Sequence, residues 1–253
     1  MNRSVSRALE ILKLLSEEKV LSLAEISKRL NIPKTSTFDI IKSLLEHSYV
    51  EIEDTEAKNY RLGFGVFELG NAYRRSLNIY NICKPSLLVL SNILNKTIML
   101  GVLHNKYVLT LDKQDPSRQL FTEGAVGMMQ PLYCTALGKA LLSVLSDNEI
   151  FTLLGHGPYE YRTRNTLRDY PALLLEIQKT RSRGYAIDNG ENYEHICCMA
   201  MAIHNQQGMP VAAISVSSLK EDYSHTDRKE VIEKLAEQVH LIELRLGYSK
   251  NTI

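Results

Sequence analysis

Apolar residues recur every three or four positions in three segments of the first 50 residues, the spacing that predicts amphipathic helices. The first segment covers residues 4–16, where Val5 and Leu9 lie on one stripe. The second begins after Ser22, and this serine with Glu25 three residues later has the pattern of a capping box at a helix start. We therefore expect two helices joined by a short extended link.

The third helical segment begins near Lys34, after an Asn-Ile-Pro break, and a short hairpin follows it. The residues predicted to face inward in this helix are Phe38, Ile41, Leu44 and Leu45. Residues 49–52 and 59–62 alternate apolar with polar side chains on either side of a charged turn, which predicts two short strands. Three short helices followed by a hairpin indicate a winged helix-turn-helix.

Residues 65–80 have the pattern of one long connecting helix. Its apolar stripe consists of Val66, Leu69, Tyr73, Leu77 and Tyr80. This stripe is either a dimer seam or part of an intramolecular core. Pro85 is then expected to start a separate helix that ends near Leu94.

The rest of the chain alternates between strand and helix patterns. Segments with strand character are 98–103, 107–112, 185–189, 196–204 and 211–217. Helices are predicted at 135–145, 172–183 and 226–246. Strands first and last with helices between them predict an α+β fold whose antiparallel sheet is covered by helices on one side. The predicted domains are a winged helix (1–64), a linker helix (65–80) and a C-terminal domain (81–253).

The composition is that of a globular protein, with 253 residues of which 44% are hydrophobic and 23% charged. No apolar run approaches the roughly 18 to 20 residues of a membrane helix, and no secretory segment precedes the first helix, so we expect a cytoplasmic protein with no membrane partner. The four cysteines lack paired CxxC spacing, as expected in a reducing compartment. Residues 1–63 hold ten basic and ten acidic residues, so affinity for DNA depends on where the cations lie.

The first turn of the predicted recognition helix carries the residues suited to DNA. In a helix-turn-helix this turn enters the major groove, and here it contains Lys34, Thr35, Ser36 and Thr37. Hydroxyls suit phosphates and base edges, and a lysine adds charge toward the backbone. Lys42 lies two turns further on, and Lys58 and Arg61 flank the wing. The alternative is that the hydroxyls only cap the helix.

Small polar side chains are expected on one face of the last two strands. Cys198 lies on one strand face, and Ser215 and Ser217 lie on a face of the next strand. If the two faces coincide, a thiol and two hydroxyls line a patch on an apolar sheet, as in a small-molecule pocket. The free amides of Ala136 and Leu137 at a helix start would seat a carboxylate. The alternative is that the small residues only allow a helix to pack closely on the sheet.

Other chemistries lack the residues that they need. The Gly138-Lys139-Ala140 segment has neither the upstream glycine nor the Ser/Thr of a P-loop. Cys197 and Cys198 are neighbours in a strand, so their thiols point to opposite faces and are poorly placed to share a zinc ion. No nucleophile and base occur at a recognisable spacing. We therefore expect no enzyme activity, no metal and no cofactor.

Several segments resemble the IclR family of bacterial transcription regulators. The matching segments are 4–12, 23–26 and 32–36 near the N-terminus, and 131–140 and 183–188 in the effector-domain signature. The strand pair around Cys198 and Ser215 is similar too. The resemblance implies a GAF-like C-terminal effector-binding domain. It also implies effector contacts at the pocket positions named above, with Asp188 and Ile196 alongside them.

One position departs from the family pattern. The recognition helix of the family usually carries a basic residue where this chain has Asp39. An acidic side chain there would repel a phosphate. Either Asp39 accepts a hydrogen bond from a cytosine amino group, or the helix docks at a shifted angle.

These features together predict a transcription regulator that binds double-stranded operator DNA as a homodimer or homotetramer. A small carboxylic or sugar-derived acid in the C-terminal domain is expected to modulate its DNA affinity. Two alternatives stay open: an enzyme with a regulatory DNA-binding head, and a protein-interaction module, which the neutral N-terminal segment would suit. The sequence leaves the operator, the identity of the effector and the sign of regulation undecided.

Overall fold

The structure, a computed structural model, describes residues 2–54, 58–76, 78–116, 124–221 and 225–248, with the side chains of 73–76 and 225–227 left out. The chain forms two compact units, residues 1–76 and 77–253. Within the described residues, no helix is both long and apolar enough to cross a membrane.

The N-terminal unit is a helix-turn-helix with a small antiparallel sheet, as predicted. Its elements are α1 (Arg3–Glu18), β1 (Leu21–Ser22), α2 (Leu23–Leu30), α3 (Lys34–Glu46), β2 (Val50–Asp54), β3 (Asn59–Leu62) and α4 (Phe64–Ser76). The sheet has the order β1-β3-β2, so the hairpin of the wing is joined by a short strand that the sequence showed only as an extended link. The predicted capping box is present, because the Ser22 side chain accepts from the Glu25 amide and the Glu25 carboxylate accepts from the Ser22 amide.

The core of this unit differs from the predicted one at three apolar positions. Ile11 and Leu15 are the buried residues of α1, whereas Val5 and Leu9 are 55% and 61% exposed. Phe38 of α3, predicted to face inward, is 53% exposed. An apolar stripe wider than the contact surface of its helix leaves one edge in solvent, and only tertiary packing decides which edge that is.

The predicted connecting helix over 65–80 corresponds to α4, described as far as Ser76, and to the first residues of α5 (Asn78–Leu94). The predicted helix start at Pro85 is wrong, because α5 begins before this proline and contains it. Leu77 and the side chain of Tyr73 lie outside the described residues. A proline inside a helix removes one backbone hydrogen bond. Here the burial of Cys83, Leu87 and Leu90 on the same helix stabilises it.

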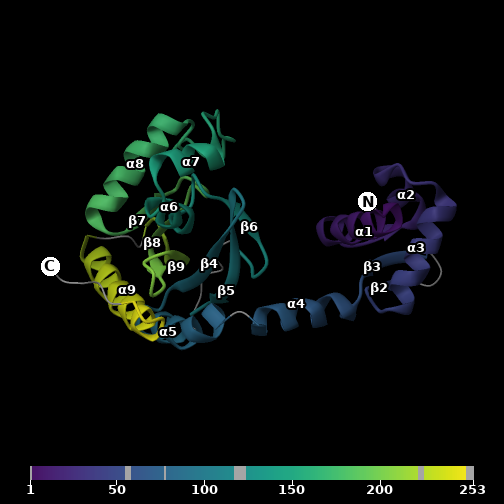
Figure 1. The fold of residues 1–253 in the computed structure, drawn as a ribbon, viewed down its shortest axis with the longest axis horizontal. Helices are drawn as coiled ribbons and strands as arrows, with labels where there is room; N and C mark the ends of the chain where they lie inside the picture. Colours follow the sequence, from purple (N-terminus) through teal and green to yellow (C-terminus); the bar gives the residue numbers. More distant parts are fainter. Residues whose placement is uncertain (1, 55–57, 77, 117–123, 222–224, 249–253) are drawn as a thin grey trace. The chain divides into compact units, whose positions relative to one another are not determined.

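The C-terminal unit is built on one six-stranded antiparallel sheet of order β6-β5-β4-β9-β8-β7 (Figure 1). Its strands are β4 (Thr97–His104), β5 (Tyr107–Gln114), β6 (Met129–Pro131), β7 (Ala186–Asn189), β8 (Ile196–His204) and β9 (Pro210–Leu219). Its helices after α5 are α6 (Ala136–Ser143), α7 (Asp147–Leu154), α8 (Tyr170–Arg183) and α9 (His225–Arg245). The five strands expected from the sequence are all present, whereas β6 and α7 were not expected.

Helices cover both faces of this sheet, and the prediction of one covered face is wrong. On one face, α6 packs against β4, β8 and β9, and α7 and α8 add Ile150, Leu173 and Ile177 to the same core cluster. On the other face, α5 and α9 enclose the larger side chains of the same strands, among them Met199 and Ile214. Both sets of alternate strand positions are apolar enough to be buried, so both faces take a helical layer.

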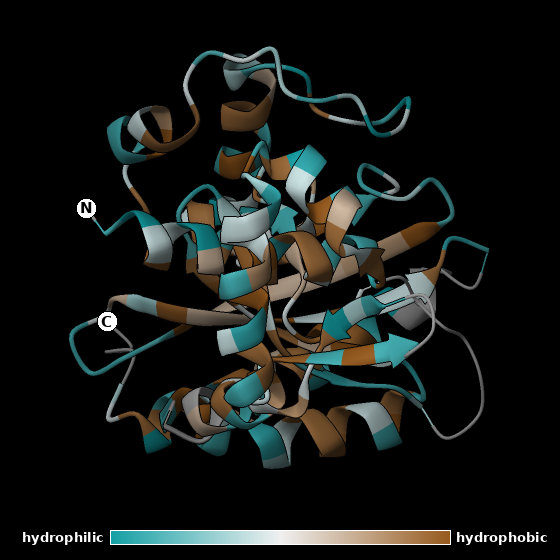
Figure 2. Cartoon of the chain, turned by 90° about the vertical axis from the view of Figure 1, so that its right-hand side faces the viewer, coloured by the Kyte–Doolittle hydropathy of each residue, from teal (hydrophilic) through white to brown (hydrophobic). Residues whose placement is uncertain are grey.

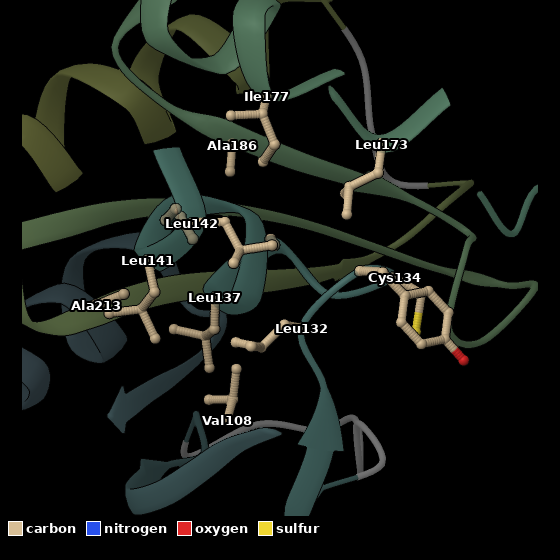
Figure 3. Packing of buried hydrophobic residues seen from close by; sticks show 14 of the residues in the cluster. Val108, Leu132, Cys134, Leu137, Leu141, Leu142, Leu173, Ile177, Ala186 and Ala213 are labelled. Carbon is tan, nitrogen blue, oxygen red and sulfur yellow. The ribbon is translucent and has the colours of Figure 1, made fainter. Parts of the chain in front are cut away.

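Amphipathic helices pack their apolar sides against the sheet in these layers. The helices in Figure 2 are banded, with hydrophobic and hydrophilic residues alternating along them, as expected where one side is buried. Figure 3 shows Leu137 and Leu141 of α6 pointing toward Val108 and Ala213 of the sheet, with Leu173 and Ile177 of α8 on the other side of α6. Gly138 permits this close packing, because a Cβ there would overlap the backbone of Leu132.

Candidate functional site

A cavity lies between the start of α6 and the polar face of the large sheet. Its volume is about 30 Å³, room for only one or two water molecules. All seven residues that were predicted to contact an effector line it: Ala136, Leu137, Asp188, Ile196, Cys198, Ser215 and Ser217. The remaining lining residues were not predicted from the sequence: Met99, Gln130, Thr135, Asn192 and Tyr193.

Strand register explains why the polar residues meet. Cys198 of β8 lies opposite both Ser217 of β9 and Asp188 of β7, and Ser215 lies opposite Met99 of β4. The thiol of Cys198 is 3.2 Å from the Ser217 hydroxyl, in hydrogen-bond contact. The thiol and the two hydroxyls therefore lie on one face of the sheet, as predicted.

The first turn of α6 closes the cavity from above the sheet. Thr135 is the N-cap, and its side-chain oxygen accepts from the Gly138 amide at 3.1 Å while donating to the Pro131 carbonyl at 2.9 Å. The amides of Ala136 and Leu137 belong to the first turn, where an α-helix provides no acceptor of its own. A helix start with free amides attracts an anion.

Behind the cavity lies a cluster of buried charges that the sequence analysis missed. Lys139 is fully buried, and its ammonium group contacts both carboxylate oxygens of Glu191, at 2.5 and 2.6 Å. The adjoining Asp188 carboxylate accepts from the Glu191 amide at 2.7 Å. Burial, followed by repulsion from Glu191, raises the pKa of Asp188 to about 7. A lysine within the apolar run of α6 was the available signal, since a buried lysine needs an acidic partner.

The cysteines are buried thiols without the environment of a nucleophile. Burial raises the pKa of Cys83 and of Cys134 to about 12, and burial also raises the pKa of Cys198. A thiol with a raised pKa stays protonated and unreactive near neutral pH. Among the described residues, no group of three or more His, Cys, Asp or Glu could hold a metal ion.

The predicted DNA-reading turn is only partly exposed. Lys34 and Thr35 are exposed at the start of α3. Ser36 is half-buried, and its hydroxyl accepts a hydrogen bond from Arg7 of α1 at 3.2 Å. Thr37 is fully buried and its hydroxyl donates to the Pro33 carbonyl at 3.1 Å, so its assignment to the DNA surface is wrong. The capping alternative is not observed either, because the N-cap of α3 is Pro33 and no side chain caps the helix.

The other cations predicted to bind DNA differ in whether a carboxylate already pairs with them. Lys42 is exposed on α3, and Lys58 is exposed at the wing turn, where it adopts a positive φ of 49°. Arg61 of the wing forms an ion pair with Glu51 at 2.6 Å and a second ion pair with Glu53. A DNA phosphate would have to compete with these carboxylates for Arg61. Its contribution is expected to be smaller than that of the two lysines.

Comparison with known proteins identifies the family. The model of the IclR helix-turn-helix domain matches residues 4–54, and that of the bacterial transcriptional regulator IclR C-terminal domain matches residues 71–243. The chain is 30% identical to the HTH-type transcriptional regulator XynR of Escherichia coli, over 97% of this chain and 98% of XynR. It is 27% identical to the regulator KdgR of the same species, over 97% and 93%.

A solved structure agrees with both matches. The crystal structure of the Thermotoga maritima IclR superposes with a TM-score of 0.80 at 27% identity, covering 96% of this chain and 98% of that one. The matches span both units in the same order, from the helix-turn-helix to the unit that holds the cavity. The chain therefore belongs to the IclR family of bacterial transcriptional regulators, with an N-terminal helix-turn-helix domain and a C-terminal effector domain.

Proposed function

We propose that this regulator binds operator DNA through the start of α3, in the cytoplasm, and that a small organic acid in the cavity beneath α6 changes its DNA affinity. The observation that carries the proposal is the set of polar groups that converge on the cavity, which at about 30 Å³ would have to widen to admit an organic acid. Its lining combines three side-chain donors or acceptors on one sheet face with the free amides of a helix start. Convergent polar groups in apolar walls are what small-molecule recognition requires.

The ligand class follows from the charges of the lining. Within the described part of the chain, the cavity lining includes no lysine or arginine. Amides and hydroxyls can hold one carboxylate, but they cannot neutralise a second negative charge. In its ionised form, Asp188 would add to the repulsion of a dianion. The expected effector is a monoanionic or neutral hydroxy, keto or sugar acid, and not a phosphate ester.

The DNA contacts follow from which polar groups stay exposed. Lys34 and Thr35 are available to the groove, and Arg7 with Ser36 forms a second polar group beside them. Lys42 and Lys58 are exposed, and we expect them to contact the DNA backbone. We retain Ser36 as a weaker contact, because its hydroxyl already has a partner.

Alanine substitutions test this assignment. Thr35→Ala is expected to weaken binding to a DNA sequence selected from a random pool by about 1 to 2 kcal/mol. Lys34→Ala should weaken binding to all DNA sequences and flatten the salt dependence by about one unit. Lys13→Ala, which removes an exposed lysine of α1, is the control. Equal DNA affinities for all three variants and the wild type would contradict the assigned surface.

Self-association is the remaining part of the proposal. Paired operator half-sites need two recognition helices at a fixed spacing. Phe64, Phe67 and Leu69 leave apolar surface exposed on α4, as expected of a segment that pairs with a second copy. Leu69→Asp is expected to shift the protein to a smaller size on a sizing column, with its secondary structure retained. An unchanged elution volume would place the dimer seam elsewhere.

A further inference from the structure

Phe38 leaves an aromatic ring in solvent on α3, the helix that we assign to the major groove. Its relative exposure is 53%, although the sequence pattern predicts it to face inward. The inner face of α3 is filled by Thr37, Ile41 and Leu44, which are all buried. Phe38 follows Thr37, so its side chain points about 100° around the helix from that residue and does not share its core. The ring is therefore available to a partner outside this unit.

Phe38 belongs to a row of exposed side chains that runs along α3. The members of the row are Thr35, Phe38, Asp39 and Lys42. Their spacing of i, i+3, i+4 and i+7 places them on one face of the helix. A hydroxyl, a carboxylate and an ammonium group thus surround one apolar ring. This mixture suits the major groove, where base edges present a methyl group beside hydrogen-bond donors and acceptors.

Asp39 is the acidic member of the row, and it forms no ion pair with another described residue. DNA phosphates repel a carboxylate, so Asp39 is compatible with bound DNA where the groove offers it a hydrogen-bond donor. The donors in the major groove are the amino groups of cytosine and adenine, and adenine places an acceptor, N7, next to its amino group. An ionised carboxylate only accepts hydrogen bonds. Cytosine is therefore the better partner for Asp39.

The ring of Phe38 calls for an apolar partner in the same groove. Thymine is the one base of unmodified DNA that presents a methyl group there. Contact between the ring and this methyl group removes both from water, which favours binding. On the basis of the DNA surface proposed above, we infer that Phe38 contacts a thymine methyl group and that Asp39 accepts a hydrogen bond from a cytosine amino group. Adjacent helix residues rise about 1.5 Å and base pairs about 3.4 Å, so the two bases should lie within about two base pairs of each other.

The first experiment replaces thymine by uracil, which removes the methyl group and keeps every hydrogen-bonding group of the base. The duplex is one that the full-length wild type selects from a random pool, and each thymine of one half-site is replaced in turn. Fluorescence anisotropy of the wild type is expected to show one replacement that weakens binding about fourfold, the loss of one buried methyl group. Phe38→Ala should bind the thymine and the uracil duplex equally well.

Phe67→Ala is the matched control for the loss of the ring. It removes an exposed phenylalanine of α4, whose exposure is 63%. If α4 joins two copies of the chain, the overall DNA affinity of this variant falls, but its ratio of thymine to uracil affinity should stay at the wild-type value. Wild-type binding that no uracil alters overturns the assignment of Phe38. A difference between thymine and uracil that persists in Phe38→Ala also overturns it, because the shape of the duplex then detects the methyl group.

The second experiment tests Asp39 by a change of base preference. Asparagine pairs with N6 and N7 of adenine, whereas aspartate accepts from cytosine. Selection with Asp39→Asn is therefore expected to replace one cytosine of the wild-type site by adenine, within about two base pairs of the thymine. The wild type should bind the cytosine duplex at least about fivefold more tightly than the adenine duplex, and Asp39→Asn should reverse this order. Glu17→Gln, which alters an exposed carboxylate of α1, should select the wild-type site. An unchanged site for Asp39→Asn overturns the assignment of Asp39.

These measurements separate the base contacts from the proposed DNA surface. If Thr35→Ala and Lys34→Ala weaken DNA binding while uracil has no effect and Asp39→Asn selects the wild-type site, α3 remains the DNA surface and the inference alone is wrong. If the wild type binds no selected duplex more tightly than random DNA, the proposed function is overturned, and the base contacts fall with it.

Discussion

The two faces of the large sheet come from the same strands but are filled in opposite ways. Toward α5 and α9, β9 presents Ile214 and Val216 within a continuous apolar core. Toward α6, the same strand presents Ser215 and Ser217, with Cys198 of β8 opposite Ser217. Because successive strand residues point to opposite faces, one strand can close one layer and leave polar groups and a cavity in the other.

The difference shows how the fold separates stability from binding. Large apolar side chains on the α5/α9 face contribute burial free energy of roughly 25 cal/mol per Å². The α6 face gives up part of that burial, and its polar groups instead form specific contacts: Cys198 with Ser217, and Lys139 with Glu191. Substitutions on the two faces should therefore have different consequences, for stability on one and mainly for ligand binding on the other.

The largest effect on the free energy of unfolding is expected from breaking the buried ion pair on the α6 face. Lys139→Met leaves Glu191 buried without its cation, which should lower the free energy of unfolding by about 3 to 5 kcal/mol. The double variant Lys139→Met, Glu191→Gln removes both charges and should regain most of that loss. Urea denaturation measures both. A double variant as unstable as the single one would show that packing, and not the unpaired charge, causes the loss.

A core truncation on the other face should affect stability alone. Leu100→Ala removes a fully buried side chain from the α5/α9 side, with an expected loss of about 2 to 5 kcal/mol in unfolding free energy. The affinity of the folded protein for a small acid should stay unchanged, because Leu100 does not line the cavity. Loss of ligand binding in the folded variant would mean that the two faces are not independent.

The raised pKa of Asp188 predicts a pH dependence of stability with a definite sign. In the unfolded chain the group ionises near its ordinary pKa of 3.8, and in the folded protein it ionises near 7. The folded state therefore holds the proton more tightly, and its contribution to stability is complete below 3.8 and is lost as the pH rises toward 7. Relative to the wild type, Asp188→Asn should gain about 1 to 3 kcal/mol in unfolding free energy at about pH 8 compared with about pH 4. Unfolding curves at the two pH values measure this. An equal difference at both would exclude a titrating Asp188.

Two adjacent serines, one on each face of the sheet, should differ in their effect on ligand binding. Ser217 faces the cavity, and its neighbour Ser218, equally buried, points to the other face, where its hydroxyl has no hydrogen-bond partner among the described residues. Ser217→Ala should weaken the binding of a small acid by about 1 to 3 kcal/mol. Ser218→Ala should leave ligand affinity unchanged and stability equal or slightly higher. Equal effects of both substitutions on binding would remove the distinction between the faces.

Local patterns were enough to predict much of the fold. Alternation over 196–204 predicted β8 with its observed ends, and the Ser22–Glu25 pattern predicted the start of α2. The same capping pattern at Ser146 and Glu149 marks α7, and it was overlooked. The position of Pro85 inside α5 and the outward position of Phe38 could not be predicted locally, because tertiary packing decides them.

Local patterns also predicted some residues of the candidate site and missed others. Period-two alternation was sufficient to group Cys198, Ser215 and Ser217. Lys139 within the apolar run of α6 signals a buried charge, but its partner Glu191 is far away in the sequence, so no local pattern identifies the pair. Thr37 looked like its neighbours Thr35 and Ser36, and only its burial separates it from them.

In the proposed function, a ligand in the polar-face cavity changes DNA affinity. The direct measurement is the DNA affinity of the wild type, Ser217→Ala and Ser218→Ala by fluorescence anisotropy. It uses a duplex selected from a random pool, and a panel of small organic acids is titrated in. One acid is expected to change the wild-type affinity by about 5- to 150-fold. Ser217→Ala should need a higher concentration of that acid, whereas Ser218→Ala should match the wild type. Identical acid responses in all three proteins, or tight DNA binding that no acid alters, would contradict the claim.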